Sequence, residues 1–168
     1  YNTRITSIKF PASLERITDN PFESCNKLEK FIITDSNKHF TVRDGVLFDY
    51  DQKRLICYPE TKTDQKYTVP DSVVTIGSHA IYSGEKLEQI TLPDTLQSIE
   101  DLAFAFCYEL REINIPSTVS YIGDRVFLEC WKLINVSVHP DSLAAKYCDM
   151  NKIPYTYPNN ADWLLQAP

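Results

Sequence analysis

Residues 89–110, QITLPDTLQSIEDLAFAFCYEL, are followed at residues 112–133 by EINIPSTVSYIGDRVFLECWKL, and the two stretches share one pattern of apolar residues and proline. Three residue types keep a spacing of 23 residues along the chain: Pro70, Pro93 and Pro116; Ile76, Ile99 and Ile122; Leu87, Leu110 and Leu133. A repeat of roughly 20 to 29 residues with this apolar pattern indicates units that bury their hydrophobic faces against one another. The sequence therefore predicts an elongated stack of repeats.

The period of the apolar residues changes within each unit and predicts its local structure. Residues 89–92 alternate apolar and polar side chains, which indicates a short strand, and Pro93 ends it because proline has no N–H to donate. Residues 96–99 form a second extended segment, and the spacing of three and four across 103–110 predicts a short helix. The expected fold class is an α/β repeat solenoid, a leucine-rich-repeat right-handed superhelix of short strands and short helices.

The whole chain, 1–168, is expected to be one solenoid domain. Its predicted repeats cover about 5–28, 67–87, 88–110 and 111–133. Between the first two, about 34–66, two apolar runs at 45–48 and 55–58 flank the polar turn 51–53, which predicts a β-hairpin insertion.

A C-terminal cap is predicted over about 134–168. It should contain a strand at 136–138, a helix with Asp141 or Ser142 as its N-cap, and a strand at 153–157. At the other end, Tyr1 begins almost inside a strand pattern without an initiating methionine or a leader, so the natural protein is expected to extend upstream.

Composition and charge exclude several function classes. Lysine and arginine total 17 against 23 acidic residues, giving a net charge of −6, and no basic stripe with interleaved aromatics occurs. Nucleic acid is therefore not an expected partner. The longest wholly apolar run, 102–108, is far shorter than the roughly 18 residues of a membrane span, so no span is expected.

Five cysteines cannot all pair internally, and Cys25, Cys107 and Cys130 share one repeat offset. The main interpretation is a ladder of buried thiols; a disulfide between Cys107 and Cys130 is the alternative, because stacked repeats bring such residues near bridging distance.

No catalytic set and no cofactor site are predicted. His39, His79 and His139 lack a nucleophile and an acidic partner in any motif, and His79 is expected to face solvent in a repeat turn. Asp44, Asp49 and Asp51 could hold calcium, but their spacing misses the calcium-loop pattern and Asp44-Gly45 is better explained as a turn. Glycine-rich phosphate loops are also absent from the sequence.

Strand alternation predicts an outward ladder of mainly short polar side chains that forms a candidate partner-binding face. Its members are Lys9, Ile32, Thr68, Thr91, Asn114 and Ser137, flanked by Ser7, Lys30, Lys66, Gln89, Glu112 and Asn135. A wet sheet face must be polar in any case, so the main interpretation of this ladder is an ordinary solvated surface, with partner docking as the alternative. Among these, Lys9, Thr68, Thr91, Asn114 and Ser137 are the candidate docking residues.

The repeat closely resembles the BspA-like leucine-rich repeats of bacterial surface proteins, whose unit has the form L-x-x-I-x-[LI]-P-x-x-[LV]-x-x-I-G-x-x-A-F-x-x-C-x-x-L. Residues 87–110 and 110–133 follow it, with the glycine present as Gly77 and Gly123 but replaced by Glu100 in the unit between. Residues 40–59 are similar to a hairpin variant of that family, and 142–155 to its closing unit. The resemblance implies a secreted or cell-surface protein whose solenoid binds host, matrix or other cell-surface proteins, without catalytic residues or a cofactor.

Two other functions stay open at this point. A carbohydrate-binding module would use Tyr50, Tyr58, Tyr155, Tyr157 and Trp163 as stacking surfaces. A passive spacer in a larger surface protein would need no binding face.

Overall fold

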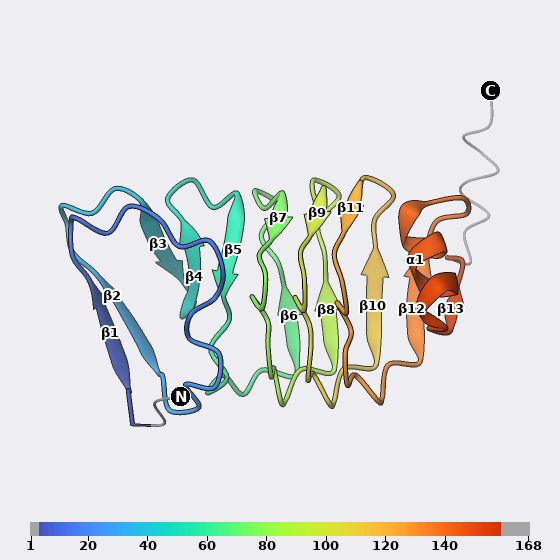
Figure 1. Cartoon of the computed structure of the whole chain (residues 1–168), viewed down its shortest axis with the longest axis horizontal. Coiled ribbons are helices and arrows are strands. Elements are labelled where there is room, and N and C mark those ends of the chain that lie inside the picture. Colours follow the sequence, from blue (N-terminus) through green and yellow to red (C-terminus); the bar gives the residue numbers. More distant parts are fainter. Residues whose placement is uncertain (1–3, 159–168) are drawn as a thin grey trace.

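The computed structural model describes residues 4–158, which form coils stacked along one long axis (Figure 1). Along the chain the elements are β1 (Ser7–Phe10), β2 (Lys30–Ile33), β3 (Phe40–Arg43), β4 (Val46–Asp49), β5 (Arg54–Cys57), β6 (Lys66–Thr68), β7 (Thr75–Ile76), β8 (Gln89–Thr91), β9 (Ser98–Ile99), β10 (Glu112–Ile115), β11 (Tyr121–Ile122), β12 (Asn135–Val138), α1 (Leu143–Asn151) and β13 (Tyr155–Thr156).

The coils stack through two main sheets. β6, β8, β10, β12 and β13 form a five-stranded parallel sheet, whereas β7, β9 and β11 continue a sheet that begins with β3, β4 and β5; β1 and β2 form a separate pair. The register follows the sequence period, because Ile76 lies beside Ile99 and Ile99 beside Ile122. The predicted alignment of equivalent residues from coil to coil is confirmed.

The third side of each coil is a run of tight turns, and the predicted short helix at 103–110 is wrong. In each of the three regular repeats, two residues of the turn run adopt left-handed backbone, as at Leu102 (φ 55°) and Phe106 (φ 62°). The N–H groups of Leu102, Phe104 and Phe106 donate to the carbonyl oxygens of Asp124, Val126 and Leu128 in the next coil, at 3.0, 3.0 and 2.7 Å. Because these donors bond between coils, they are not free for the i to i−4 bonds of a helix.

Two hydrophobic cores lie on either side of β4 and β5. These strands pair antiparallel and bury both faces, as parallel strands of layered proteins do. Phe48 and Leu55 belong to the large core of the repeats, whereas Leu47 and Ile56 belong to a smaller core with Phe10 and other residues of the N-terminal coil. The two strands therefore form a wall between the cores, visible between β2 and β7 in Figure 1.

The C-terminal unit agrees with its predicted elements. Ser142 is the N-cap of α1, and its hydroxyl accepts the Ala145 N–H at 3.1 Å, whereas Asp141 precedes the cap in left-handed backbone. α1 packs beside β11, and β13 adds the last strand of the parallel sheet. No helix in residues 4–158 is long and apolar enough to cross a bilayer.

All five cysteines are free and buried, so the predicted burial of the thiols is confirmed and the Cys107–Cys130 disulfide is not formed. Cys107 and Cys130 lie in the large core, whereas Cys25 lies in the small one. The Cys107 thiol donates to the Ile81 carbonyl at 3.0 Å, and the Cys130 thiol donates to the Phe104 carbonyl at 3.1 Å. Burial raises the pKa of Cys130 to about 12, which keeps that thiol protonated and unreactive near neutral pH.

Core and sheet-face positions should respond very differently to truncation. Phe104 is fully buried and stacks on Phe127 at 5.5 Å between ring centroids. Phe104→Ala should lower the free energy of unfolding by about 3–5 kcal/mol, because it opens a cavity. Thr91→Ala on the exposed sheet face should change it by at most about 0.5 kcal/mol. Chemical denaturation measures both, and equal losses would contradict the assigned facing.

Candidate functional site

Four of the five predicted docking residues form one row on the outer face of the parallel sheet. Register places Thr68 beside Thr91, Thr91 beside Asn114, and Asn114 beside Ser137; β13 extends the row with Thr156. A second outward row runs alongside it: Lys66, Gln89, Glu112 and Asn135. A shallow depression of about 130 Å³ lies over the two rows. We call these two rows the sheet face.

Lys9 is not part of the sheet face. It lies on β1 and pairs with Ile32 in the separate two-stranded sheet, while β6 forms the N-terminal edge of the five-stranded sheet. The break arises because β3, β4 and β5, which lie between β2 and β6 in the chain, belong to the other sheet. The predicted ladder is therefore divided into two parts.

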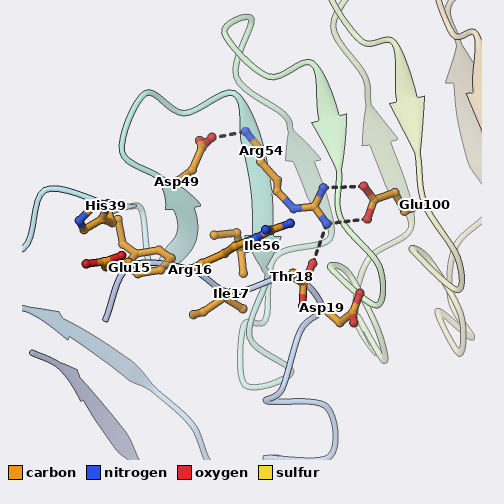
Figure 2. A pocket seen from close by; sticks show the side chains of 11 residues that line it. Glu15, Arg16, Ile17, Thr18, Asp19, His39, Asp49, Arg54, Ile56 and Glu100 are labelled. Atoms are coloured by element: carbon orange, nitrogen blue, oxygen red, sulfur yellow. Dashed lines mark hydrogen bonds and ion pairs between the residues drawn. The ribbon is translucent and has the colours of Figure 1, made fainter. Parts of the chain in front are cut away.

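A pocket of about 370 Å³ lies where the N-terminal segment 15–19 crosses the second sheet. Figure 2 shows the Arg54 side chain extending from β5 across this pocket toward Glu100 and Thr18. Its two terminal nitrogens donate to the two carboxylate oxygens of Glu100, each at 2.5 Å, and Nη2 also donates to the Thr18 carbonyl at 2.7 Å. The Glu100 carboxylate further accepts the Ser78 N–H at 3.0 Å.

This ion pair explains why one unit departs from the glycine of its neighbours. At Gly77, an added Cβ would lie 2.9 Å from the Leu55 carbonyl oxygen and 3.1 Å from Arg54 Nη2. Gly77 thus leaves space for the guanidinium group to pass over one coil and reach Glu100 in the next. No sequence pattern indicates this pair, because Arg54 lies outside the repeats and no repeat offset connects it to Glu100.

The Arg54–Glu100 ion pair in this pocket joins separate segments of the chain, and we call it the clamp. Both terminal nitrogens of Arg54 are already bonded within the protein, and they tie the N-terminal segment at Thr18 to two strands of the second sheet. Nothing in this geometry presents the guanidinium to an external anion. We therefore assign the pocket a structural role.

His79 takes part in a second group of polar contacts between the N-terminal coil and the repeats. It does not simply face solvent as predicted. Its Nε2 lies 3.5 Å from Glu23 Oε2, and its Nδ1 lies 3.0 Å from the Ser78 hydroxyl. Asn20 Nδ2 donates to the His79 carbonyl at 2.9 Å, and the Asn20 N–H donates to the Ser78 carbonyl at 3.2 Å. These contacts hold the N-terminal coil against the coil that contains β7.

The aspartates considered for calcium are used in turns. Asp44 (φ 51°) and Gly45 (φ 79°) form the two-residue connection between β3 and β4, a turn that requires left-handed backbone at both positions. Asp49 Oδ1 accepts the N–H groups of Lys53 and Arg54 at 2.7 and 2.9 Å. Among residues 4–158, no three His, Cys, Asp or Glu side chains are grouped as metal ligands.

The aromatics predicted for carbohydrate stacking do not share one surface. Tyr58 is buried in the large core, whereas Tyr50 is exposed next to β4. Tyr155 and Tyr157 contact each other at 5.8 Å near the C-terminal end, and Trp163 lies outside the described residues. This set is therefore not a stacking platform.

Removing the Arg54 partner should destabilise the chain in a pH-dependent way. Burial of Glu100 raises its pKa, but the hydrogen bonds and charge of Arg54 outweigh that effect, so the pKa lies below its ordinary value. The stabilisation is fully present above the unfolded pKa of about 4.3 and is lost as pH falls through the lower folded value. Glu100→Gln should cost about 1–3 kcal/mol at pH 7.

Urea denaturation at pH 7 and at pH 3 measures this difference, with Glu112→Gln on the exposed sheet face as the matched control. The difference in the free energy of unfolding between the wild type and Glu100→Gln should be smaller at pH 3 than at pH 7. A difference that stays constant would contradict the ionic origin of the clamp.

Comparison with known proteins agrees with this architecture. The BspA type leucine rich repeat region matches residues 1–46 and 56–153 in six copies. No curated protein sequence matches the chain. Three solved structures share the fold. A leucine-rich repeat protein from Eubacterium ventriosum is 28% identical with a TM-score of 0.76, over 81% of this chain and 37% of its own.

The other two are more distant in sequence and show the fold alone. A leucine rich cell surface protein from Faecalibacterium prausnitzii is 24% identical with a TM-score of 0.61, over 96% of this chain and 50% of its own. The pneumococcal vaccine antigen PcpA is 22% identical with a TM-score of 0.54, over 80% of this chain and 51% of its own. The present chain thus spans about half or less of each of these chains. With its repeats matched over most of its length and stacked in register, the chain belongs to the BspA-type leucine-rich repeat family.

Proposed function

We propose that this chain is a non-catalytic, adhesin-like module of a larger bacterial cell-surface or secreted protein, and that it binds a protein partner through the sheet face. The observation that carries the proposal is the alignment of Thr68, Thr91, Asn114 and Ser137 in one row on hydrogen-bonded parallel strands. Since each strand is fixed by its neighbours, the row is pre-organised and loses little freedom when it binds. Solenoids commonly bind partners through such extended surfaces.

The chemistry of the sheet face suits a polar protein surface. One row carries the short polar side chains of Thr68, Thr91, Asn114 and Ser137, and at its end the Thr156 hydroxyl donates to Asn135 Oδ1 at 3.2 Å. Lys66 and Glu112 place opposite charges two strands apart in the other row, which favours a partner with complementary charges. The location outside the cell is supported by the family assignment.

Replacement of the central sheet-face residues should weaken partner binding without unfolding the chain. The double variant Thr91→Arg and Asn114→Arg places two long charged side chains on the exposed face, and Ser117→Arg on an exposed loop is the control. On an array of human extracellular-matrix and cell-surface proteins, the wild type should bind at least one partner, and the double variant should bind it about tenfold or more weakly.

Ser117→Arg should bind like the wild type. Biolayer interferometry gives the affinities, and thermal melting checks that all three proteins are folded. If the wild type binds no protein of the array and no cultured epithelial cells, the adhesin-like function is wrong and the chain acts as a spacer.

A further inference from the structure

A continuous row of aromatic side chains crosses three successive coils on the turn side of the solenoid. Its members, which we call the aromatic row, are Tyr82, Phe106, Tyr108 and Trp131. Successive ring centroids lie 5.0, 6.1 and 5.6 Å apart, with interplanar angles of 52°, 78° and 54°. The rings thus pack tilted or edge to face in one continuous row, and Tyr108 and Trp131 are its exposed members.

The fold does not require aromatic side chains at these positions. Tyr108 and Trp131 follow the core cysteines Cys107 and Cys130, at an offset that holds Asn26 and Glu85 in other units. Trp131 is 75% exposed and Tyr108 is 38% exposed, so their rings contribute a large apolar area to the surface rather than to the core. An exposed aromatic cluster of this kind indicates a binding surface.

Phe106 gives an independent indication of function. It adopts left-handed backbone at φ 62°, as do Ser24, Ser83 and Glu129 at the same offset. Four turn runs share this conformation at this offset, but a bulky aromatic residue tolerates it poorly. A strained side chain that completes the row between Tyr82 and Tyr108 suggests selection for the surface rather than for stability.

A polar groove continues from the row. It has a volume of about 590 Å³ and is lined by Thr63, Gln65, Glu85, Lys86, Glu88, Tyr108 and Glu109. Its charges are largely compensated within the protein, because Lys132 Nζ lies 2.6 Å from Glu109 Oε1 and Arg111 Nε lies 3.8 Å from Glu88 Oε2. The groove offers many hydrogen-bonding groups with little net positive charge, which fits an uncharged polar ligand better than a polyanion.

We propose that the aromatic row and this groove bind a neutral oligosaccharide chain. Aromatic faces pack against the C–H faces of sugar rings, and carboxylate and amide groups hydrogen-bond to the hydroxyl groups that project beside them. The site shares no residue with the sheet face, but the two adjoin where Gln65 precedes Lys66 and Glu88 precedes Gln89. The inference goes beyond the proposed protein-binding function and does not depend on it.

Intrinsic fluorescence tests the site directly, because Trp131 is one of two tryptophans in the chain. In a Trp163→Phe background, titration with cellohexaose, maltohexaose, xylohexaose and mannohexaose should give a saturable fluorescence change with at least one sugar. Tyr108→Ala should weaken that binding about tenfold or more, by calorimetry. Trp131→Ala should do the same, whereas Tyr121→Ala, which removes a 52% exposed ring from β11, should not.

A second variant separates binding from folding. Phe106→Ser installs the residue that two other coils carry at this offset, so it should weaken sugar binding while leaving the melting temperature equal or higher. The sheet-face variant with Thr91→Arg and Asn114→Arg should bind sugar like the wild type. The sheet-face variant thus tests the protein-binding proposal separately from the sugar-binding proposal, so that either can fail without the other.

Three outcomes would overturn the inference. One is no response to any of the four sugars up to roughly 10 mM, a concentration that still detects weak single-site binding. Another is preferential binding to heparin or to phosphatidylglycerol vesicles. The third is that no sugar binds, while a protein from the array binds the wild type and does not bind the Trp131→Ala variant. That result would assign the aromatic row to protein contact.

Discussion

Hydrogen bonding between coils is the constraint on which the rest of this structure depends. Strands pair in register on two sides, as Ile76 with Ile99, and the turn side adds its own bonds, such as Leu102 N–H to the Asp124 carbonyl. Because buried backbone groups must find partners, each coil has to present its N–H and C=O groups where the next coil needs them. This requirement fixes the repeat length at 23 residues in the regular part and stacks equivalent side chains into a continuous core.

The N-terminal coil is joined to the repeats by a different set of interactions. β4 and β5 separate its small core from the large one, so apolar packing alone does not connect this coil to the regular repeats. Polar contacts add to the connection, through Arg54 with Glu100 and Thr18, through His79 with Glu23, and through the Asn20 N–H with the Ser78 carbonyl. These contacts are directional and specify one orientation of the coil, as buried polar groups do in other proteins. Glu100 in place of glycine is therefore part of the architecture.

The sequence predicted features that rest on local chemistry and missed those that rest on contacts between coils. The strands ended by proline, the Ser142 cap and the Asp44-Gly45 turn follow from single residues in their local context. The turn run at 103–110 has the same three-and-four spacing as a helix, and only its bonds to the next coil distinguish the two. Arg54 with Glu100, and Phe106 with Tyr82, join residues whose proximity depends on stacking, which no local pattern encodes.

Inward and outward offsets of the repeat carry different information. Inward positions are held by the core, so Ile76, Ile99 and Ile122 report the fold and say nothing about a ligand. Outward positions do not pack in the core. A residue there that differs in type from its equivalents in other repeats therefore reflects what the surface contacts. The sheet face keeps polar residues from coil to coil, which a solvated sheet would also show. The offset of Asn26, Glu85, Tyr108 and Trp131 instead changes from polar to aromatic toward the C-terminal coils, and a core requirement does not explain that change. Function in such a repeat is therefore best sought where outward residues break the period.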